Sequence, residues 1–201
     1  MIGEILRITA EHVLIVAIAV GVAVVLGIPL GIYCTRNPRA GRVALRVIDT
    51  IQTIPSLALF GFLIPVPFIG GIGMRTAIVA LILYSLLPIV RNTFVGIRGV
   101  DPVVRDAGVA LGLTSRQLLF DVELPLAMPS IVAGIRIATV IGIGVATIAA
   151  AVGGGGLGTF IFRGVAMVDT RLILAGALPA AALALIADVV LSVVERRMIK
   201  G

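Results

Sequence analysis

The chain has 201 residues with a net charge of +6; 60% of the residues are hydrophobic, only 13% are charged, and the mean hydropathy is +1.22. Because about a quarter of the residues in an ordinary soluble domain are charged, this composition excludes a soluble globular protein and indicates an integral membrane protein. The positive charge does not indicate a nucleic-acid-binding protein, since the basic residues cluster beside apolar runs without interleaved aromatic residues.

Five apolar stretches are long enough to cross a bilayer, for which a helix needs roughly 20 residues. They cover residues 13–33, 43–63, 77–94, 130–151 and 172–194. The first is too long for a signal-peptide core and follows two glutamates, so we expect it to remain in the mature protein. The sequence therefore predicts an all-α membrane protein, with one domain over residues 1–201 and a core at about 10–196.

The distribution of Lys and Arg predicts how the helices are oriented in the membrane. Placing the loops after the first and third stretches and the C-terminus on one side gives that side eleven of these residues and the other side four, with Arg136 inside a stretch. Cytoplasmic loops are the ones enriched in Lys and Arg. We therefore expect the N-terminus outside and the C-terminus in the cytoplasm.

The segment 101–125 is the only long polar interruption between apolar stretches. Asp101 can cap a helix that begins at Pro102, where the missing N–H would have no intrahelical partner. Gly112 suits the left-handed residue that closes a helix, so this helix should end near Leu111.

A second short helix is predicted directly after that glycine. Thr114 and Gln117 have the spacing of a capping box, in which each residue satisfies a backbone N–H of the other. Because proline disfavours a helical conformation in the residue before it, we expect this helix to stop before Pro125. The segment should then form a compact cytoplasmic knob of two short helices.

The knob resembles the EAA loop of ABC importer permeases, in which Glu-Ala-Ala is followed at fixed spacing by Gly and then by Ile-x-Leu-Pro. The spacing matches over the whole loop, about residues 99–125, with Asp for Glu, Gly for the second Ala and Val for Ile. This resemblance implies docking in a cleft of a cytoplasmic ATPase subunit; an amphipathic cytoplasmic loop without that role is the alternative. The implied coupling residues are Asp106, Ala107, Gly108, Gly112, Val122, Leu124 and Pro125.

Polar residues also occur inside the second apolar stretch. Asp49, Gln52 and Ser56 fall at i, i+3 and i+7, with Thr53 alongside, so an unbroken helix would carry them on one face. Such a face either lines a translocation path or forms hydrogen bonds between helices, and both interpretations stay open. Pro55 predicts a kink in the middle of this face.

Asp188 is the one carboxylate well inside the fifth stretch, where an unpaired charge is costly. It lies six residues from the cytoplasmic end of its stretch, and Arg136 lies six residues from that end of the fourth stretch. Both are therefore about 9 Å deep at 1.5 Å per residue. We expect an intramembrane ion pair between them, with Arg91, Arg46 and backbone groups as competing partners.

No residue pattern indicates catalysis or a bound cofactor. The glycine-rich run 153–158 lacks the Lys and Ser/Thr of a phosphate-binding loop, and the only lysine is Lys200. We therefore expect that this chain binds no nucleotide or metal, and that ATP and Mg²⁺ bind to partner ATPase subunits. The glycines are interpreted as a tight external turn, His12 as a residue at the membrane interface, and Cys34 as a small packing residue.

Longer strings narrow the resemblance: TIQTIPSLALFGFLIP at 50–65, LPIVRNTFVGI at 87–97 and ELPLAMPSIVAGIR at 123–136. Together they resemble permease subunits of osmoprotectant importers for glycine betaine, carnitine or choline. The resemblance implies a type I ABC importer in a prokaryotic plasma (inner) membrane, with two permease subunits, identical or related, two ATPase subunits and an external substrate-binding protein. The alternatives are a methionine or other amino-acid importer permease and, in a different class, an ion-coupled secondary transporter or channel.

Overall fold

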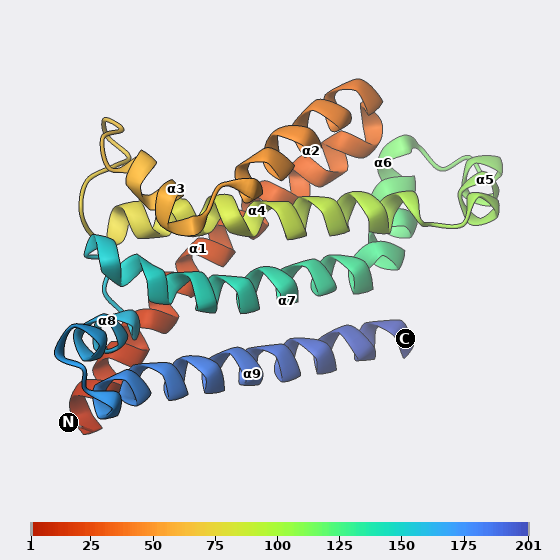
Figure 1. Cartoon of the computed structure of the whole chain (residues 1–201). Helices are drawn as coiled ribbons and strands as arrows, with labels where there is room; N and C mark the ends of the chain where they lie inside the picture. Colours follow the sequence, from red (N-terminus) through yellow and green to blue (C-terminus); the bar gives the residue numbers. More distant parts are fainter. Residues whose placement is uncertain (1, 201) are drawn as a thin grey trace.

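The computed structural model describes residues 2–200, which form helices joined mostly by short connections (Figure 1). The predicted all-α membrane fold is confirmed. In chain order the elements are α1 (Ile2–Arg36), α2 (Pro38–Thr53), α3 (Ser56–Leu63), α4 (Met74–Arg98), α5 (Pro102–Ala110), α6 (Ser115–Gln117), the π-helical turn η1 (Leu118–Glu123), α7 (Leu124–Ala149), the 3-10 turn η2 (Ala150–Val152), α8 (Gly158–Met167) and α9 (Thr170–Lys200).

Four segments are each long and apolar enough to cross a membrane: Gly3–Arg36, Met74–Arg98, Ser115–Val152 and Thr170–Ile199. The bent pair α2 and α3 is the fifth candidate. In Figure 1, α1 ends near the start of α2, whereas α4 starts at the opposite end of the bundle, so the bent pair carries the chain back across. The two marked chain ends accordingly lie at opposite ends of the bundle.

The second span is broken, which corrects the prediction of one helix over residues 43–63. The axes of α2 and α3 differ by 102°. The break lies at Pro55, which has no N–H to donate, and Ile54 before it is extended, with φ −73° and ψ 124°. Steric conflict with a following proline favours this extended backbone, so the bend is far larger than the kink that the sequence predicted.

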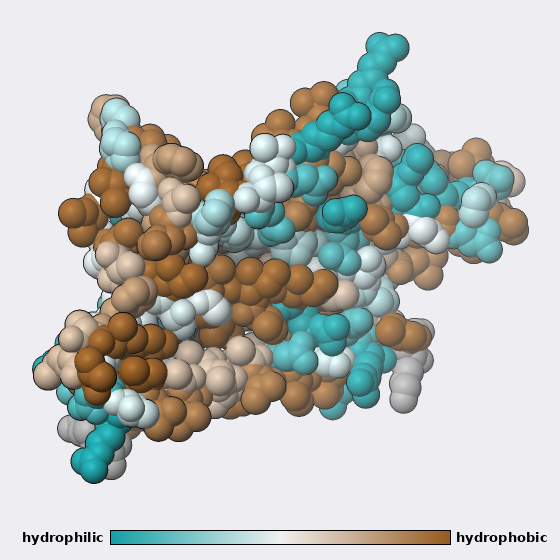
Figure 2. Space-filling model, in the orientation of Figure 1, coloured by the Kyte–Doolittle hydropathy of each residue, from teal (hydrophilic) through white to brown (hydrophobic). Residues whose placement is uncertain are grey.

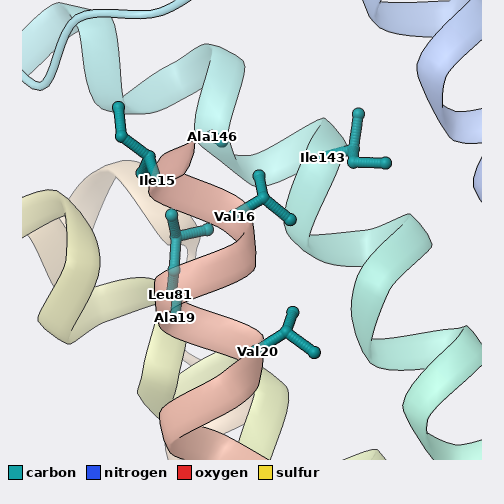
Figure 3. Packing of buried hydrophobic residues seen from close by; sticks show 7 residues of the cluster. All are labelled: Ile15, Val16, Ala19, Val20, Leu81, Ile143 and Ala146. Carbon is teal, nitrogen blue, oxygen red and sulfur yellow. The ribbon is translucent and has the colours of Figure 1, made fainter. Parts of the chain in front are cut away.

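The core forms where α1 crosses α4 and α7. Side chains from the three helices meet in one buried cluster (Figure 3), made of Ile15, Val16, Ala19, Val20, Leu81, Ile143 and Ala146. The molecular surface is largely apolar over the middle of the bundle, and hydrophilic residues gather toward its ends, many of them near the start of α2 and around α5 (Figure 2). An apolar belt with polar ends is what a bilayer requires of a spanning protein.

Close contact between α4 and α7 depends on glycine. A Cβ added at Gly134 would lie 2.7 Å from both the Cβ of Asn92 and the carbonyl oxygen of Pro88. One at Gly96 would lie 2.8 Å from the Cβ of Ser130. Small residues that let backbones approach are typical of helix contacts in membranes, where packing rather than water exclusion drives association.

The prediction that a helix stops before Pro125 is wrong. The segment from Ser115 to Val152 is continuous, with η1 joining α6 to α7. Within η1 the N–H of Leu124 donates to the carbonyl of Leu119, five residues back. Pro125 occupies the first turn of α7, directly after this wider turn. A π-helical turn changes the hydrogen-bond register locally, which lets the helix continue past a residue that has no N–H.

The glycine run lies at the end of the bundle opposite α5 and leads into α8, a helix that the sequence did not predict (Figure 1). Gly155 has φ +77°, and a Cβ there would lie 2.0 Å from the Oε1 atom of Glu11. The run therefore packs tightly on α1, and glycine is needed both for its backbone conformation and for the close approach.

His12, which the sequence places at the membrane interface, is fully buried among protein side chains. Its Nδ1 accepts a hydrogen bond from the N–H of Leu157 at 3.3 Å, so Nε2 carries the hydrogen and donates to the carbonyl of Ile143 at 3.1 Å. Gly156 leaves room for this ring, because a Cβ there would lie 2.7 Å from Nδ1. The imidazole thus ties α1 to the glycine run and to α7.

Candidate functional site

The knob projects from one end of the bundle (Figure 1). Asp101 caps α5, accepting a hydrogen bond from the N–H of Val103 at 2.8 Å. The helix ends at Ala110, and Gly112 has φ +82°, which is the left-handed conformation that the sequence predicted for it. The local signals for the first knob helix are therefore confirmed.

The capping box is also confirmed. The N–H of Gln117 donates to the Oγ1 of Thr114 at 3.3 Å, and the N–H of Thr114 donates to the Oε1 of Gln117 at 3.0 Å. These reciprocal bonds satisfy two backbone donors that a helix start otherwise leaves without a partner. They begin the α6 segment that runs on into α7.

Large apolar side chains on the knob are exposed. Val103, Val109 and Leu111 expose 73%, 60% and 83% of their surface, with Asp106 and Ala107 exposed on the same short helix. A group of apolar residues on a projecting polar loop is typical of a protein interaction site. The knob therefore has the composition of a docking surface, with an acidic residue at its centre.

Gly108, which is also in the predicted coupling set, lies beneath that outer surface. It is buried, and a Cβ at this position would lie 2.8 Å from Cδ1 of Leu118 and 3.3 Å from Cδ1 of Leu113. The glycine allows α5 to lie on η1. The last three predicted residues lie at the base of the knob, where Val122 and Leu124 are half-buried and Pro125 is exposed.

Glu123 is a residue of this region that the sequence analysis missed. It is wholly buried between two arginines, and its carboxylate pairs with Arg36 at the end of α1 and with the Nε of Arg105 in α5 at 2.9 Å. No local signal could have found it, because Arg36 lies 87 residues away in sequence.

The break between α2 and α3 is fastened to α4 by two hydrogen bonds. The Nε2 of Gln52 donates to the carbonyl of Tyr84 at 2.8 Å, and the hydroxyl of Tyr84 donates to the carbonyl of Ile54. Gln52 therefore makes the interhelical hydrogen bond that was one of its two predicted roles. The carbonyl that the extended Ile54 presents is satisfied in the same contact.

The break also separates the polar residues that an unbroken helix would align. Ser56 belongs to α3, so the expectation that it shares one helical face with Asp49 and Gln52 is wrong. Thr53 is exposed at the end of α2, and Asp49 lies 3.6 Å from Arg91 in a half-exposed ion pair.

The structure places Arg136 and Asp188 within ion-pair distance, with 3.7 Å between Nε and Oδ1. Glu195, which the sequence analysis missed, lies 3.5 Å from the same guanidinium. Glu195 lies seven residues after Asp188, about two helical turns, so both carboxylates share one face of α9. This spacing was the signal in the sequence that could have predicted the second contact. Arg136 on α7 thus holds two carboxylates of α9.

The profile of the family described as "Binding-protein-dependent transport system inner membrane component" matches residues 27–200. The chain belongs to this family. It is therefore a multi-pass membrane component of a transport system, which is not itself catalytic. The predicted family resemblance is confirmed.

Named relatives extend this match over nearly the whole chain. The choline transport system permease protein OpuBB of Bacillus subtilis is 45% identical over 98% of this chain and 89% of its own length. The carnitine transport permease protein OpuCD of Listeria monocytogenes is 47% identical over 94% of this chain and 83% of its own length. The osmoprotectant import permease protein OsmW of Salmonella typhimurium is 44% identical over 92% of this chain and 87% of its own length.

Solved structures support the fold. The inward-facing MetNI methionine ABC transporter has a chain that superimposes with a TM-score of 0.86 at 23% identity, covering 96% of this chain and 95% of that one. A chain of an amino acid ABC transporter crystallised with histidines gives 0.74 at 18% identity, over 98% and 96%. The fold is that of type I ABC importer permeases.

Proposed function

We propose that this chain is the transmembrane permease of an ATP-driven importer for an osmoprotectant such as glycine betaine, carnitine or choline. The observation that carries this proposal is the identity of 43–47% to permeases named for these compounds over almost the entire chain. The likeness to methionine and amino-acid transporters is 18–24% in sequence and supports the fold alone. An ion-coupled carrier is disfavoured, because the family is defined by its dependence on a binding protein.

The proposed assembly has two permease subunits, two ATPase subunits that bind ATP and Mg²⁺, and an external binding protein. The exposed apolar residues of the knob support ATPase docking, with Asp106, Ala107 and Gly112 on the outer surface. Gly108 supports that surface from within. Most arginines belong to the end of the bundle that carries the knob, which supports a cytoplasmic knob and C-terminus and an external N-terminus.

Within the membrane, we assign the translocation path to the exposed side of the broken span. Thr53 and Asp49 on α2 and Ser56 on α3 are at least partly exposed, whereas Gln52 is bonded to α4. A proline break provides irregular backbone at membrane depth, which is tolerated where it borders protein or a water-filled cavity. Selectivity for a quaternary ammonium group is assigned to the binding protein, because the chain has no Trp and only two Tyr for a cation–π cage.

The test is reconstitution of the permease with its ATPase and binding proteins in liposomes. We expect ATP-dependent uptake of labelled glycine betaine, carnitine or choline, and none without the binding protein. Labelled methionine is the control substrate. ATP-driven uptake of methionine alone would move the chain to the amino-acid importers, and uptake driven by an ion gradient without ATP would overturn the proposal.

A further inference from the structure

Glu123 links three parts of the chain that meet below the knob. It is the last residue of η1, directly before α7. One of its carboxylate oxygens pairs with Arg36, the last residue of α1, and the other lies 2.9 Å from Nε of Arg105 in α5. Both arginines are about one third exposed, whereas the carboxylate has no exposed surface. The negative charge is thus enclosed and the positive charges reach solvent.

This arrangement holds the three elements in one geometry. A buried carboxylate is stabilised only when opposite charges and hydrogen-bond donors take the place of water, and moving either arginine away removes part of that compensation. The contact with Arg36 is also a charge-assisted hydrogen bond, which is directional and resists rotation as well as separation, whereas the contact with Arg105 is an ion pair without hydrogen-bond geometry. The knob cannot shift relative to α1 and α7 without loss of at least one of these contacts.

The contact with Arg36 reaches the corner that leads into the broken span. Only Asn37 separates the end of α1 from the start of α2, and its Oδ1 accepts the N–H of Ala40 to cap α2. The covalent connections of α5 lead to α4 on one side and to α6 on the other. The ion pairs therefore provide a route from α5 to the α1–α2 corner that the chain connections do not.

We propose that Glu123 is a positioning residue that transmits displacement of the knob, through Arg105 and Arg36, to the α1–α2 corner and so to the broken span. This inference rests on the proposed docking of an ATPase on the knob. Glu123 contacts neither substrate nor nucleotide in this scheme. Its role is to make the broken span follow the knob during ATP hydrolysis.

The test compares uptake with ATP hydrolysis in the complete reconstituted transporter. In Glu123→Gln the two arginines lose their shared charge partner, and we expect uptake per ATP hydrolysed to fall about fivefold or more, the low end of typical coupling between sites. Asp121→Asn is the matched control, because it removes an exposed carboxylate from the same π-helical turn. Its uptake per ATP should equal that of the unmodified transporter.

A merely structural role predicts a different result. It would lower the melting temperature and reduce uptake and hydrolysis in proportion, so uptake per ATP would stay constant. Arg105→Gln is the milder variant, because Glu123 keeps Arg36, and it decides the question if Glu123→Gln does not assemble. Arg39→Gln, next to the corner but exposed, is its control.

An unchanged ratio in Glu123→Gln or, where that variant fails to assemble, in Arg105→Gln overturns the inference. Failure of the proposed ATPase docking has a separate signature, since the unmodified permease would then neither retain the ATPase nor stimulate its hydrolysis. When Glu123→Gln and Arg105→Gln are combined, the second substitution should cause little further loss of uptake per ATP, because both changes remove the same link.

Discussion

Gly134→Ala tests whether the close crossing of α4 and α7 holds the bundle together. The new Cβ would lie 2.7 Å from the carbonyl oxygen of Pro88 and from the Cβ of Asn92, whereas ordinary contacts begin at 3.4 Å. Removing the overlap requires a shift of about 0.7 Å, which is the difference between these two distances. The oxygen belongs to the backbone of α4 and cannot rotate away, so the two helices must separate.

The expected cost follows from two opposing effects. Overpacking that forces a backbone shift costs about 3 kcal/mol at the upper end of its usual range. Alanine regains about 1 kcal/mol of helix propensity over glycine. The net loss in the free energy of unfolding should therefore be about 2 kcal/mol.

Gly144→Ala is the matched control on the same helix. A Cβ at Gly144 has no atom within 4 Å, so this substitution should leave the melting temperature unchanged or raise it. The assay is thermal unfolding of the purified permease in detergent, followed by far-ultraviolet circular dichroism. If Gly134→Ala melts at or above the temperature of Gly144→Ala, the glycine crossing does not hold the two helices together and the reasoning is refuted.

Three further predictions concern the knob, the broken span and α9. Gly112→Trp places a bulky side chain on the exposed knob at φ +82°, so hydrolysis should continue with little uptake; unchanged uptake would remove Gly112 from the docking surface. In a background without the native cysteine, Thr53→Cys should react faster with an aqueous thiol reagent than Gln52→Cys, whose position faces α4; equal rates would refute the assigned exposed side. Arg136→Gln and Asp188→Asn should each lower the free energy of unfolding, measured by thermal unfolding. The double variant should lose about 0.5–1 kcal/mol less than the sum of the two single losses, whereas strictly additive losses would exclude the pair.

Much of this protein could be predicted from sequence because the relevant physics is local. Apolar length defines the spans, and the caps at Asp101 and Thr114 use hydrogen bonds between residues two or three positions apart. The left-handed Gly112 follows from the absence of a Cβ. The common depth of Arg136 and Asp188 followed from the rise of a helix alone.

The tertiary structure decided what depends on the packing of distant segments. Pro55 predicted a kink, but the 102° bend is held by contacts of α2 with α4. The burial of Glu123 depends on Arg36, 87 residues away, and that of His12 depends on Leu157, 145 residues away. Sequence spacing carries no information about such meetings, because they arise only when helices pack. Whether a charged or polar side chain is exposed or enclosed is then decided by the whole fold.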